Sequence, residues 1–217
     1  MAENLEICQE FYFQYFKPKA TILYGGMRAD VYAPFKILDA KKVIGIDYID
    51  YELPYSKNMD NHTHNKIRLY QLYENVIKNI NGLQPSKKKI KYTSIVIDDA
   101  KYYFQIRFRF NGKERQIDFY CFQYFENFTW DPKVDKVDYI MTKGAVLPSW
   151  NNFKPDVKKL WTDKLIISHY YDDETEDDLQ SNEDPDTWEL ITKAPTMFEP
   201  NYGDVGPLGI LKAITGE

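Results

Sequence analysis

The pattern of apolar and polar residues in the first half of the chain predicts short strands alternating with helices. Two apolar runs predict strands at 20–24 and 42–47, and a run of mixed character predicts a third at 92–98. Between the second and third runs, apolar residues recur at helical spacing over 63–81, and Asn81-Gly82 is typical of a helix end. The apolar positions of this helix are Leu69, Leu72, Tyr73, Val76 and Ile80.

Two shorter helices are predicted near the start of the chain. An aromatic-rich segment over 5–16 is typical of a helix that packs on a sheet, and Pro18 ends it. A second helix is predicted from an N-cap at Asp30 to Leu38, because an Asp side chain accepts hydrogen bonds from the first N–H groups of a helix. Pro34 is tolerated in this helix only within the first turn.

The clearest local prediction is an antiparallel hairpin at about 102–123. Asn111-Gly112 is the favoured two-residue turn, because both of its positions require positive φ. In the register that this turn sets, one face pairs Ile106 with Ile117, Phe104 with Phe119 and Tyr102 with Cys121. The other face pairs Arg109 with Glu114, Arg107 with Gln116 and Gln105 with Asp118. Turn and pattern agree, because one register separates apolar from polar residues.

Later apolar runs predict strands at 137–142 and 164–169, with a short helix at 155–161, and the Gly-rich stretch 203–209 is predicted to be a loop. Alternating strands and helices followed by antiparallel pieces predict an α/β fold. The expected architecture is a three-layer sandwich with a mixed, mostly parallel sheet. No repeat or linker interrupts the sequence, so a single domain is expected over 1–217.

Composition narrows the class of protein. The chain has 217 residues, of which 43% are hydrophobic, and this is enough for one α/β domain with a buried core. No run approaches the roughly 18–20 apolar residues that span a bilayer, and no secretion signal is visible. Cys8 and Cys121 are too few for a disulfide framework. We therefore expect a cytoplasmic protein that does not associate with membranes.

The net charge of −5 conceals an uneven distribution. Residues 172–186 are strongly acidic and include no basic residue, so the rest of the chain has a positive excess. Such a run is typical of an acidic surface loop. An inserted loop beside a binding face is the alternative interpretation.

Residues 21–47 suggest a function, because they contain a strand, a Gly-Gly turn, a helix-compatible segment, a second strand and an acid in that order. In a nucleotide-binding βαβ unit the turn brings backbone N–H groups close to phosphate or carboxylate groups, and the acid accepts from ribose hydroxyls. Gly26 and Asp47 are about 20 residues apart, as that geometry expects. The alternative is that Gly25-Gly26 forms only a tight turn and that Asp47 caps a loop.

With these features in order, the chain resembles the class I S-adenosylmethionine-dependent methyltransferase family. In that family the first strand leads into an acidic-x-Gly-x-Gly loop. Here Tyr24 stands at the acidic position, Gly26 at the first glycine and Arg28 at the second. Asp47 matches the acid that binds the ribose hydroxyls.

The resemblance is best over 21–50 and extends loosely to 138–145 and 165–169. It implies a Rossmann-like fold and S-adenosylmethionine as cofactor, with an acceptor that the sequence does not name. Asp99 would approach the adenine amino group, although Asp98-Asp99 is equally typical of a turn. The residues that the resemblance implies for the cofactor site are Tyr24, Gly25, Gly26, Met27, Arg28, Asp47, Tyr48 and Asp99.

Two residues at predicted strand ends are candidates for catalysis. Lys143 stands where the family positions its methyl acceptor, and His169 can act as a base near neutral pH. A solvated charge and a hydrogen-bonded buried histidine are the respective alternatives. His62 and His64 are better explained by a polar segment before a helix than by a metal site, so no metal is predicted.

Two functions from different classes remain open. One is an S-adenosylmethionine-dependent methyltransferase with an atypical cofactor loop, and the other is an inactive relative that binds a protein or nucleic-acid partner. Basic and aromatic residues around the hairpin suit a nucleic acid, but the apolar face and the Arg109–Glu114 pair argue against it. The chain has no Gly-x-Ser-x-Gly elbow and no Walker loop, which disfavours hydrolases and nucleoside triphosphatases.

Overall fold

The computed structural model describes residues 2–48, 60–84, 89–124, 127–131, 133, 136–142, 159, 164–169, 188–193, 197–199, 203–205 and 208–213. The helical elements in these ranges are α1 (Ala2–Tyr12), the short π-helix η1 (Ala33–Ile37) and α2 (Asn61–Gly82). The strands are β1 (Thr21–Gly25), β2 (Lys42–Asp47), β3 (Lys91–Asp98), β4 (Tyr103–Phe110), β5 (Lys113–Cys121), β6 (Tyr139–Thr142), β7 (Leu165–His169), β8 (Trp188–Lys193), β9 (Met197–Glu199), β10 (Gly203–Val205) and β11 (Leu208–Ala213).

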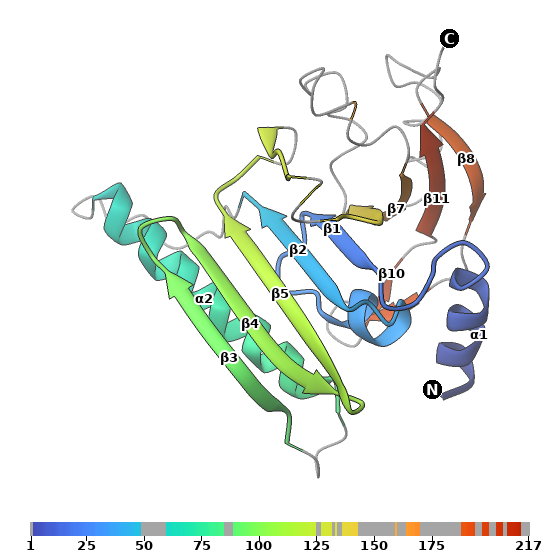
Figure 1. Ribbon diagram of the computed structural model, residues 1–217, viewed down its shortest axis with the longest axis horizontal. Coiled ribbons are helices and arrows are strands. Elements are labelled where there is room, and N and C mark those ends of the chain that lie inside the picture. The colour runs from blue at the N-terminus through green and yellow to red at the C-terminus, as the bar shows by residue number, and fades with distance from the viewer. Residues whose placement is uncertain are drawn as a thin grey trace.

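Nine of the described strands form one twisted sheet in the order β3-β4-β5-β2-β1-β6-β7-β11-β8 (Figure 1). Strands β5, β2, β1, β6 and β7 at its centre are parallel. Antiparallel strands flank them, with β4 and β3 beyond β5 and with β11 and β8 beyond β7. Strands β9 and β10 pair separately. The predicted α/β class with a mixed sheet is therefore confirmed.

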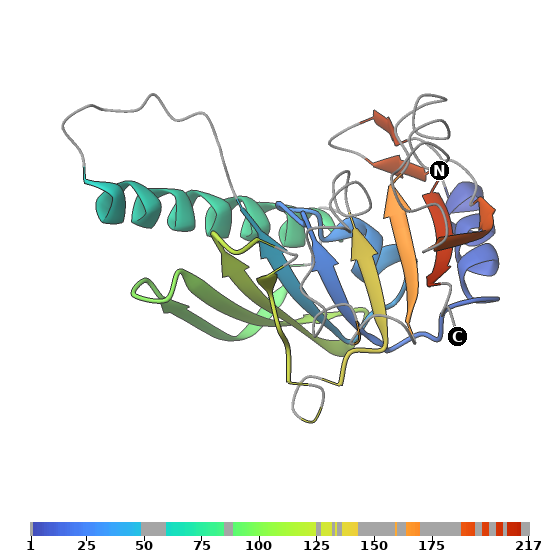
Figure 2. The ribbon, with the colours of Figure 1, turned by 90° about the horizontal axis from the view of Figure 1, so that it is seen from above.

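Helix α2 lies across one face of the sheet, over the strands at the β3 end (Figures 1 and 2). Its first turn is fixed by Asp60, whose Oδ1 accepts a hydrogen bond of 2.9 Å from the N–H of Thr63. Its predicted apolar stripe is buried at Leu69, Leu72, Val76 and Ile80. Helix α2 thus covers the strands at the β3 end of the sheet, whose apolar face would otherwise be exposed.

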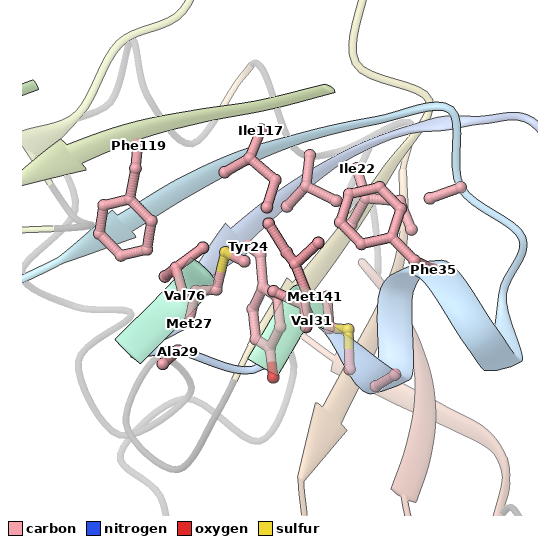
Figure 3. Close-up of a cluster of buried hydrophobic side chains, with 14 of the residues drawn as sticks. Ile22, Tyr24, Met27, Ala29, Val31, Phe35, Val76, Ile117, Phe119 and Met141 are labelled. Atoms are coloured by element: carbon pink, nitrogen blue, oxygen red, sulfur yellow. The ribbon is translucent and has the colours of Figure 1, made fainter. Parts of the chain in front are cut away.

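The main core lies between this face of the sheet and the helices. Figure 3 shows its central part, in which Tyr24, Met27, Val76 and Phe119 come together from β1, the loop after β1, α2 and β5. Side chains that point to the opposite face, such as that of Ile44, are also buried. The central parallel strands are therefore covered on both faces, which explains their continuous apolar runs.

The hairpin prediction is confirmed. Asn111 and Gly112 have φ of 50° and 74°, as the tight turn requires. Strands β4 and β5 pair in the predicted register from Phe104–Phe119 through Arg109–Glu114. Tyr102 lies just before β4, and its carbonyl accepts a hydrogen bond of 2.9 Å from the N–H of Cys121.

Two local predictions were wrong, and a third differs in its bounds. The helix expected from Asp30 to Leu38 is only the five-residue η1, because Pro34 cannot donate a helical hydrogen bond. The predicted N-terminal helix is present as α1, with bounds Ala2–Tyr12 instead of 5–16. The expected loop 203–209 contains β10 and the start of β11, because their backbones pair with β9 and β7. The predicted helix 155–161, apart from residue 159, and the acidic stretch 172–186 lie outside the described residues.

In the ranges given above, no helix is both long enough and apolar enough to cross a membrane.

Candidate functional site

The strand order reverses at β1, and this reversal defines the candidate site. The chain leaves β1 for β2 on one side and later returns as β6 on the other (Figure 1). Open α/β sheets bind ligands outside the carboxyl ends of their strands at such a reversal. Gly25 ends β1, Asp47 ends β2 and Thr142 ends β6, so all three lie at this edge.

The loop after β1 is bonded to the end of β2. Gly26 has a φ of 66°, and its N–H donates to the carbonyl of Ile46 at 2.9 Å. The N–H of Arg28 donates to Oδ2 of Asp47 at 2.7 Å. Two N–H groups that are expected to face a ligand are therefore already engaged within the protein.

Arg28 occupies a backbone conformation that favours glycine. Its φ is 49°, in the left-handed region, which costs an L-residue with a side chain roughly 1–2 kcal/mol. The backbone at this position therefore has a conformation that glycine adopts without strain, although the residue is an arginine. The Arg28 side chain is exposed.

Tyr24 and Met27 lie beneath the loop. Both side chains are fully buried (Figure 3). The hydroxyl of Tyr24 donates to Oδ2 of Asp30 at 2.7 Å. The other Asp30 oxygen accepts from the N–H groups of Tyr32 and Ala33 at the start of η1. Tyr24 thus occupies the position of the family's acid and serves to fasten the loop to η1 through Asp30.

Asp47 has one carboxylate oxygen committed to the loop. Burial raises the pKa of this carboxyl above its usual value, while the hydrogen bond and the charge of Arg28 oppose the rise. Among the described residues no hydrogen bond is made to the second oxygen, Oδ1. This oxygen can accept a hydrogen bond from a ligand hydroxyl.

Tyr48 follows Asp47 and forms an exposed aromatic surface with Tyr124. The two rings stack with centroids 4.3 Å apart and an interplanar angle of 11°. The two residues are 48% and 50% exposed, so the stacked pair is accessible at the surface. Tyr124 was not predicted, because nothing in the sequence pairs the loop after β5 with the end of β2.

Thr142 was not among the predicted site residues, although it begins the segment in which the acceptor was expected. It lies opposite Gly25 in the β1–β6 register and is fully buried, and its hydroxyl has no hydrogen-bond partner within the described part of the chain. Buried hydroxyls are normally satisfied, so an unsatisfied one at a ligand edge marks a place for a polar ligand group. The signal was present, since Thr142 is the polar end of an otherwise apolar run. The predicted residue Lys143 follows it and lies outside the described residues.

Asp99 does not lie beside Asp47. It sits in the turn between β3 and β4, paired with Lys66, and strands β4 and β5 separate its strand from β2. Three strand spacings amount to about 14 Å. Neighbouring Asp98 accepts a hydrogen bond of 3.2 Å from the N–H of Lys101, so the Asp-Asp pair forms the turn.

The histidines are dispersed. His169 ends β7 opposite Leu208 of β11, at the same carboxyl edge as Asp47. A ring nitrogen of His62 lies 2.8 Å from the hydroxyl of Tyr102, and His64 is buried on α2. Within the described part of the chain, no three His, Cys, Asp or Glu side chains cluster as metal ligands would.

Several solved structures are similar to this chain in their fold. Sp1610 of Streptococcus pneumoniae, described as a candidate tRNA (m1A22) methyltransferase, is similar over 100% of this chain and 72% of its own. The TM-score is 0.50 and the sequence identity is 14%. The ribosomal protein L11 methylase of Lactobacillus delbrueckii subsp. bulgaricus is similar over 97% of this chain and 76% of its own, with a TM-score of 0.42 and 14% identity.

A third structure is TrmK of M. capricolum in complex with S-adenosyl-homocysteine. It is similar over 98% of this chain and 68% of its own, with a TM-score of 0.43 and 9% identity. No protein-family model matches the sequence, and no curated protein matches it. The chain has a methyltransferase-like Rossmann fold, with its candidate site at the strand reversal.

Proposed function

We propose that the chain binds S-adenosylmethionine at the carboxyl ends of β1 and β2 and transfers its methyl group to an acceptor molecule. The observation that carries this proposal is the Asp47 carboxylate, which the N–H of Arg28 holds at the strand reversal with Oδ1 left for a ligand. The fold supports the proposal independently of that residue.

The adenosine half of the cofactor fits the residues at this edge. Oδ1 of Asp47 would accept a hydrogen bond from a ribose hydroxyl. The exposed rings of Tyr48 and Tyr124 offer an aromatic face on which an adenine can stack. A nucleoside therefore finds both an acceptor and an apolar surface within neighbouring strand ends.

The amino-acid half of the cofactor would be held by different groups from those that the family pattern implies. Because the N–H groups of Gly26 and Arg28 are engaged, the ligand carboxylate would depend on the exposed guanidinium of Arg28. The unsatisfied hydroxyl of Thr142 would supply a further polar contact beside Gly25. In this proposal Arg28 replaces backbone donors with a side-chain charge.

The bound cofactor would supply a sulfonium-activated methyl group. The chain's own task is then to hold the adenosine, to orient the acceptor and to accept a proton where the acceptor carries one. Lys143 and His169, which follow and end strands at this edge, are the residues we propose for that last role. The acceptor itself is not part of the proposal.

A second function is favoured by the hydrogen bonds that engage the loop after β1 within the protein. Hydrogen bonds within the protein occupy Gly26 and Arg28, and Tyr24 stands where the family has an acid. A relative that has lost catalysis would bind a partner or nucleoside without transferring a methyl group. Methyl transfer therefore separates the two functions, while nucleoside binding does not.

Calorimetry with S-adenosylmethionine and S-adenosyl-homocysteine tests cofactor binding. Asp47→Asn should weaken binding by about 1.5–3 kcal/mol, the effect of removing a hydrogen bond to a charged group. Asp99→Asn is the matched control, because it removes the same charge at the same edge about 14 Å away. If neither compound binds at millimolar concentration, the proposed methyltransferase function is excluded. If Asp47→Asn and Asp99→Asn weaken binding equally, the cofactor pocket lies elsewhere.

A further inference from the structure

A basic cavity lies at the opposite edge of the sheet from Asp47. Its volume is about 400 Å³, and residues at the start of β1 and β2 and near the β4–β5 turn line it. Five of its side chains are basic and one is acidic, namely Lys41, Lys42, Arg107, Arg115 and Lys136 against Glu114. A cavity of this size suits a small organic ligand, and its charge specifies an anionic one.

The sheet register builds the floor of this cavity. Arg107 of β4 lies opposite Gln116 of β5, Gln116 opposite Lys42 of β2, and Lys42 opposite Thr21 of β1. Residues paired in register point to the same face, so these four form one row across four strands. The row spans about 14 Å, at three strand spacings.

Two of the basic side chains already have counter-charges. Nζ of Lys42 lies 2.7 Å from Oδ2 of Asp118. The buried guanidinium of Arg115 is paired with the Asp39 carboxylate and donates to the carbonyl of Asp39 at 3.0 Å. Nε of Arg115 is buried and has no hydrogen-bond partner among the described residues. These two residues therefore form the fixed part of the lining.

The other three basic side chains belong to Lys41, Arg107 and Lys136. They are exposed and form no ion pair with any residue in the described ranges. Glu114 is the single acid of the lining, and it also lies opposite Arg109 in the β4–β5 register. Three positive charges against one acid leave a positive excess around the cavity, which a bound anion would offset.

We propose that this cavity binds a phosphate group. Phosphate oxygens accept several charge-assisted hydrogen bonds at once, and a guanidinium and ammonium groups converging from different segments can satisfy them together. The site would be carried by Lys41, Arg107 and Lys136, with the row on the sheet as its floor. It is separate from the Asp47 edge and does not depend on S-adenosylmethionine binding.

The phosphate can belong to a free phosphate compound or to a nucleic-acid backbone. The basic surface continues beyond the cavity on the same face, because Arg109 follows Arg107 two residues along β4 and lies opposite Lys91 of β3. A chain of phosphates would use this extension, whereas a single phosphate would not. Arg109 therefore distinguishes the two sources.

Binding is measured by calorimetry at low ionic strength with inorganic phosphate, a mononucleotide and a short single-stranded oligonucleotide. Arg107→Gln should weaken binding of all three by about tenfold or more, as expected for loss of a charged hydrogen bond. Lys101→Gln is the control, because it removes one exposed positive charge at the far edge, in the β3–β4 turn. Circular dichroism of each variant confirms that the fold is retained.

Two outcomes support the proposed phosphate site, and each identifies the kind of molecule to which the phosphate belongs. If Arg109→Gln weakens the oligonucleotide alone, the ligand is a nucleic-acid backbone. If it weakens none of the three probes, the ligand is a free phosphate compound. The proposal is overturned if no probe binds, or if Arg107→Gln and Lys101→Gln have the same effect.

Discussion

The backbone N–H of Arg28 donates a hydrogen bond of 2.7 Å to Oδ2 of Asp47, and this bond joins the loop after β1 to the end of β2. Any residue except proline can supply the donor, so the bond does not require glycine. What favours glycine is the φ of 49° at position 28. The arginine is therefore tolerated at a conformational cost while the connection between loop and strand is kept.

The cost at position 28 can be measured by comparing two substitutions. Arg28→Gly and Arg28→Ala both remove the side chain, but only glycine adopts positive φ without strain. Arg28→Gly should therefore have the larger free energy of unfolding, by about 1 kcal/mol. Urea denaturation measures the difference. A more stable Arg28→Ala would show that the loop takes another conformation in solution.

Asp47 should make the protein less stable as the pH rises. Burial raises its pKa above 3.8, so in the interval between the unfolded and folded pKa values the native state binds more protons than the unfolded state. The free energy of unfolding then falls as the pH increases through this interval. Relative to Asp47→Asn, the wild type should lose stability from about pH 3.8 upward and then level off. Denaturation over a pH series tests this, and a rise would contradict it.

Asp39 should show the opposite pH dependence. Burial favours its neutral form, but hydrogen bonds and charges from Lys113 and Arg115 overcome that effect and hold the pKa below 3.8. The ionised Asp39 carboxylate stabilises the fold above pH 3.8, and this contribution is lost as the pH falls through the pKa of Asp39 in the folded state. Asp39→Asn should cost about 3 kcal/mol at neutral pH, because the buried Arg115 loses its counter-charge.

The control for Asp39 is Lys113→Gln. Lys113 is half exposed and lies 2.9 Å from the same carboxylate, so its loss should cost no more than about 1 kcal/mol. Both effects should shrink at low pH, where Asp39 is protonated. If Asp39→Asn and Lys113→Gln lower the free energy of unfolding equally at neutral pH, the burial of Arg115 does not determine the strength of its ion pair with Asp39.

Gly45 leaves no room for a side chain. A Cβ at this position would lie 2.6 Å from Sδ of Met27 and 2.8 Å from the ring of Phe119. Gly45→Ala should therefore lower the free energy of unfolding by about 1–3 kcal/mol through overpacking. Combined with Met27→Ala it should cost less than the sum of the single substitutions. Gly82→Ala, which meets no atom within 4 Å, should be neutral or slightly stabilising.

Local chemistry predicted some elements well. The hairpin was predictable because the turn at Asn111-Gly112 and the alternation of Arg107 and Phe108 both act over neighbouring residues. The same holds for the apolar stripe of α2, which is a short-range signal, whereas its N-cap at Asp60 was not predicted. The position of Gly26 and Asp47 at one edge followed from the parallel β1–β2 pair.

Long-range pairing decided what the sequence did not predict. The resemblance assigned Asp99 to the same cofactor site as Asp47, with a turn as the alternative. The turn is what forms, because β5 and not β3 pairs with β2, and only the folded sheet reveals that choice. The ring of Tyr24 was expected at the ligand edge, yet β1 is buried on both faces, so no polar alternation indicates where its side chains point. The stacking of Tyr48 on Tyr124 depends on the same β2–β5 pairing.

The insertion of α2, β3 and β4 between two adjacent strands has a consequence for the order of folding. Strands β2 and β5 are neighbours, but the chain between them must first be brought back, and closing so long a loop is entropically costly. The β4–β5 hairpin is local and forms within microseconds. We therefore expect β5 to be presented to β2 as the edge of a preformed hairpin. The Asp47 edge would then be completed only after this hairpin has docked on β2.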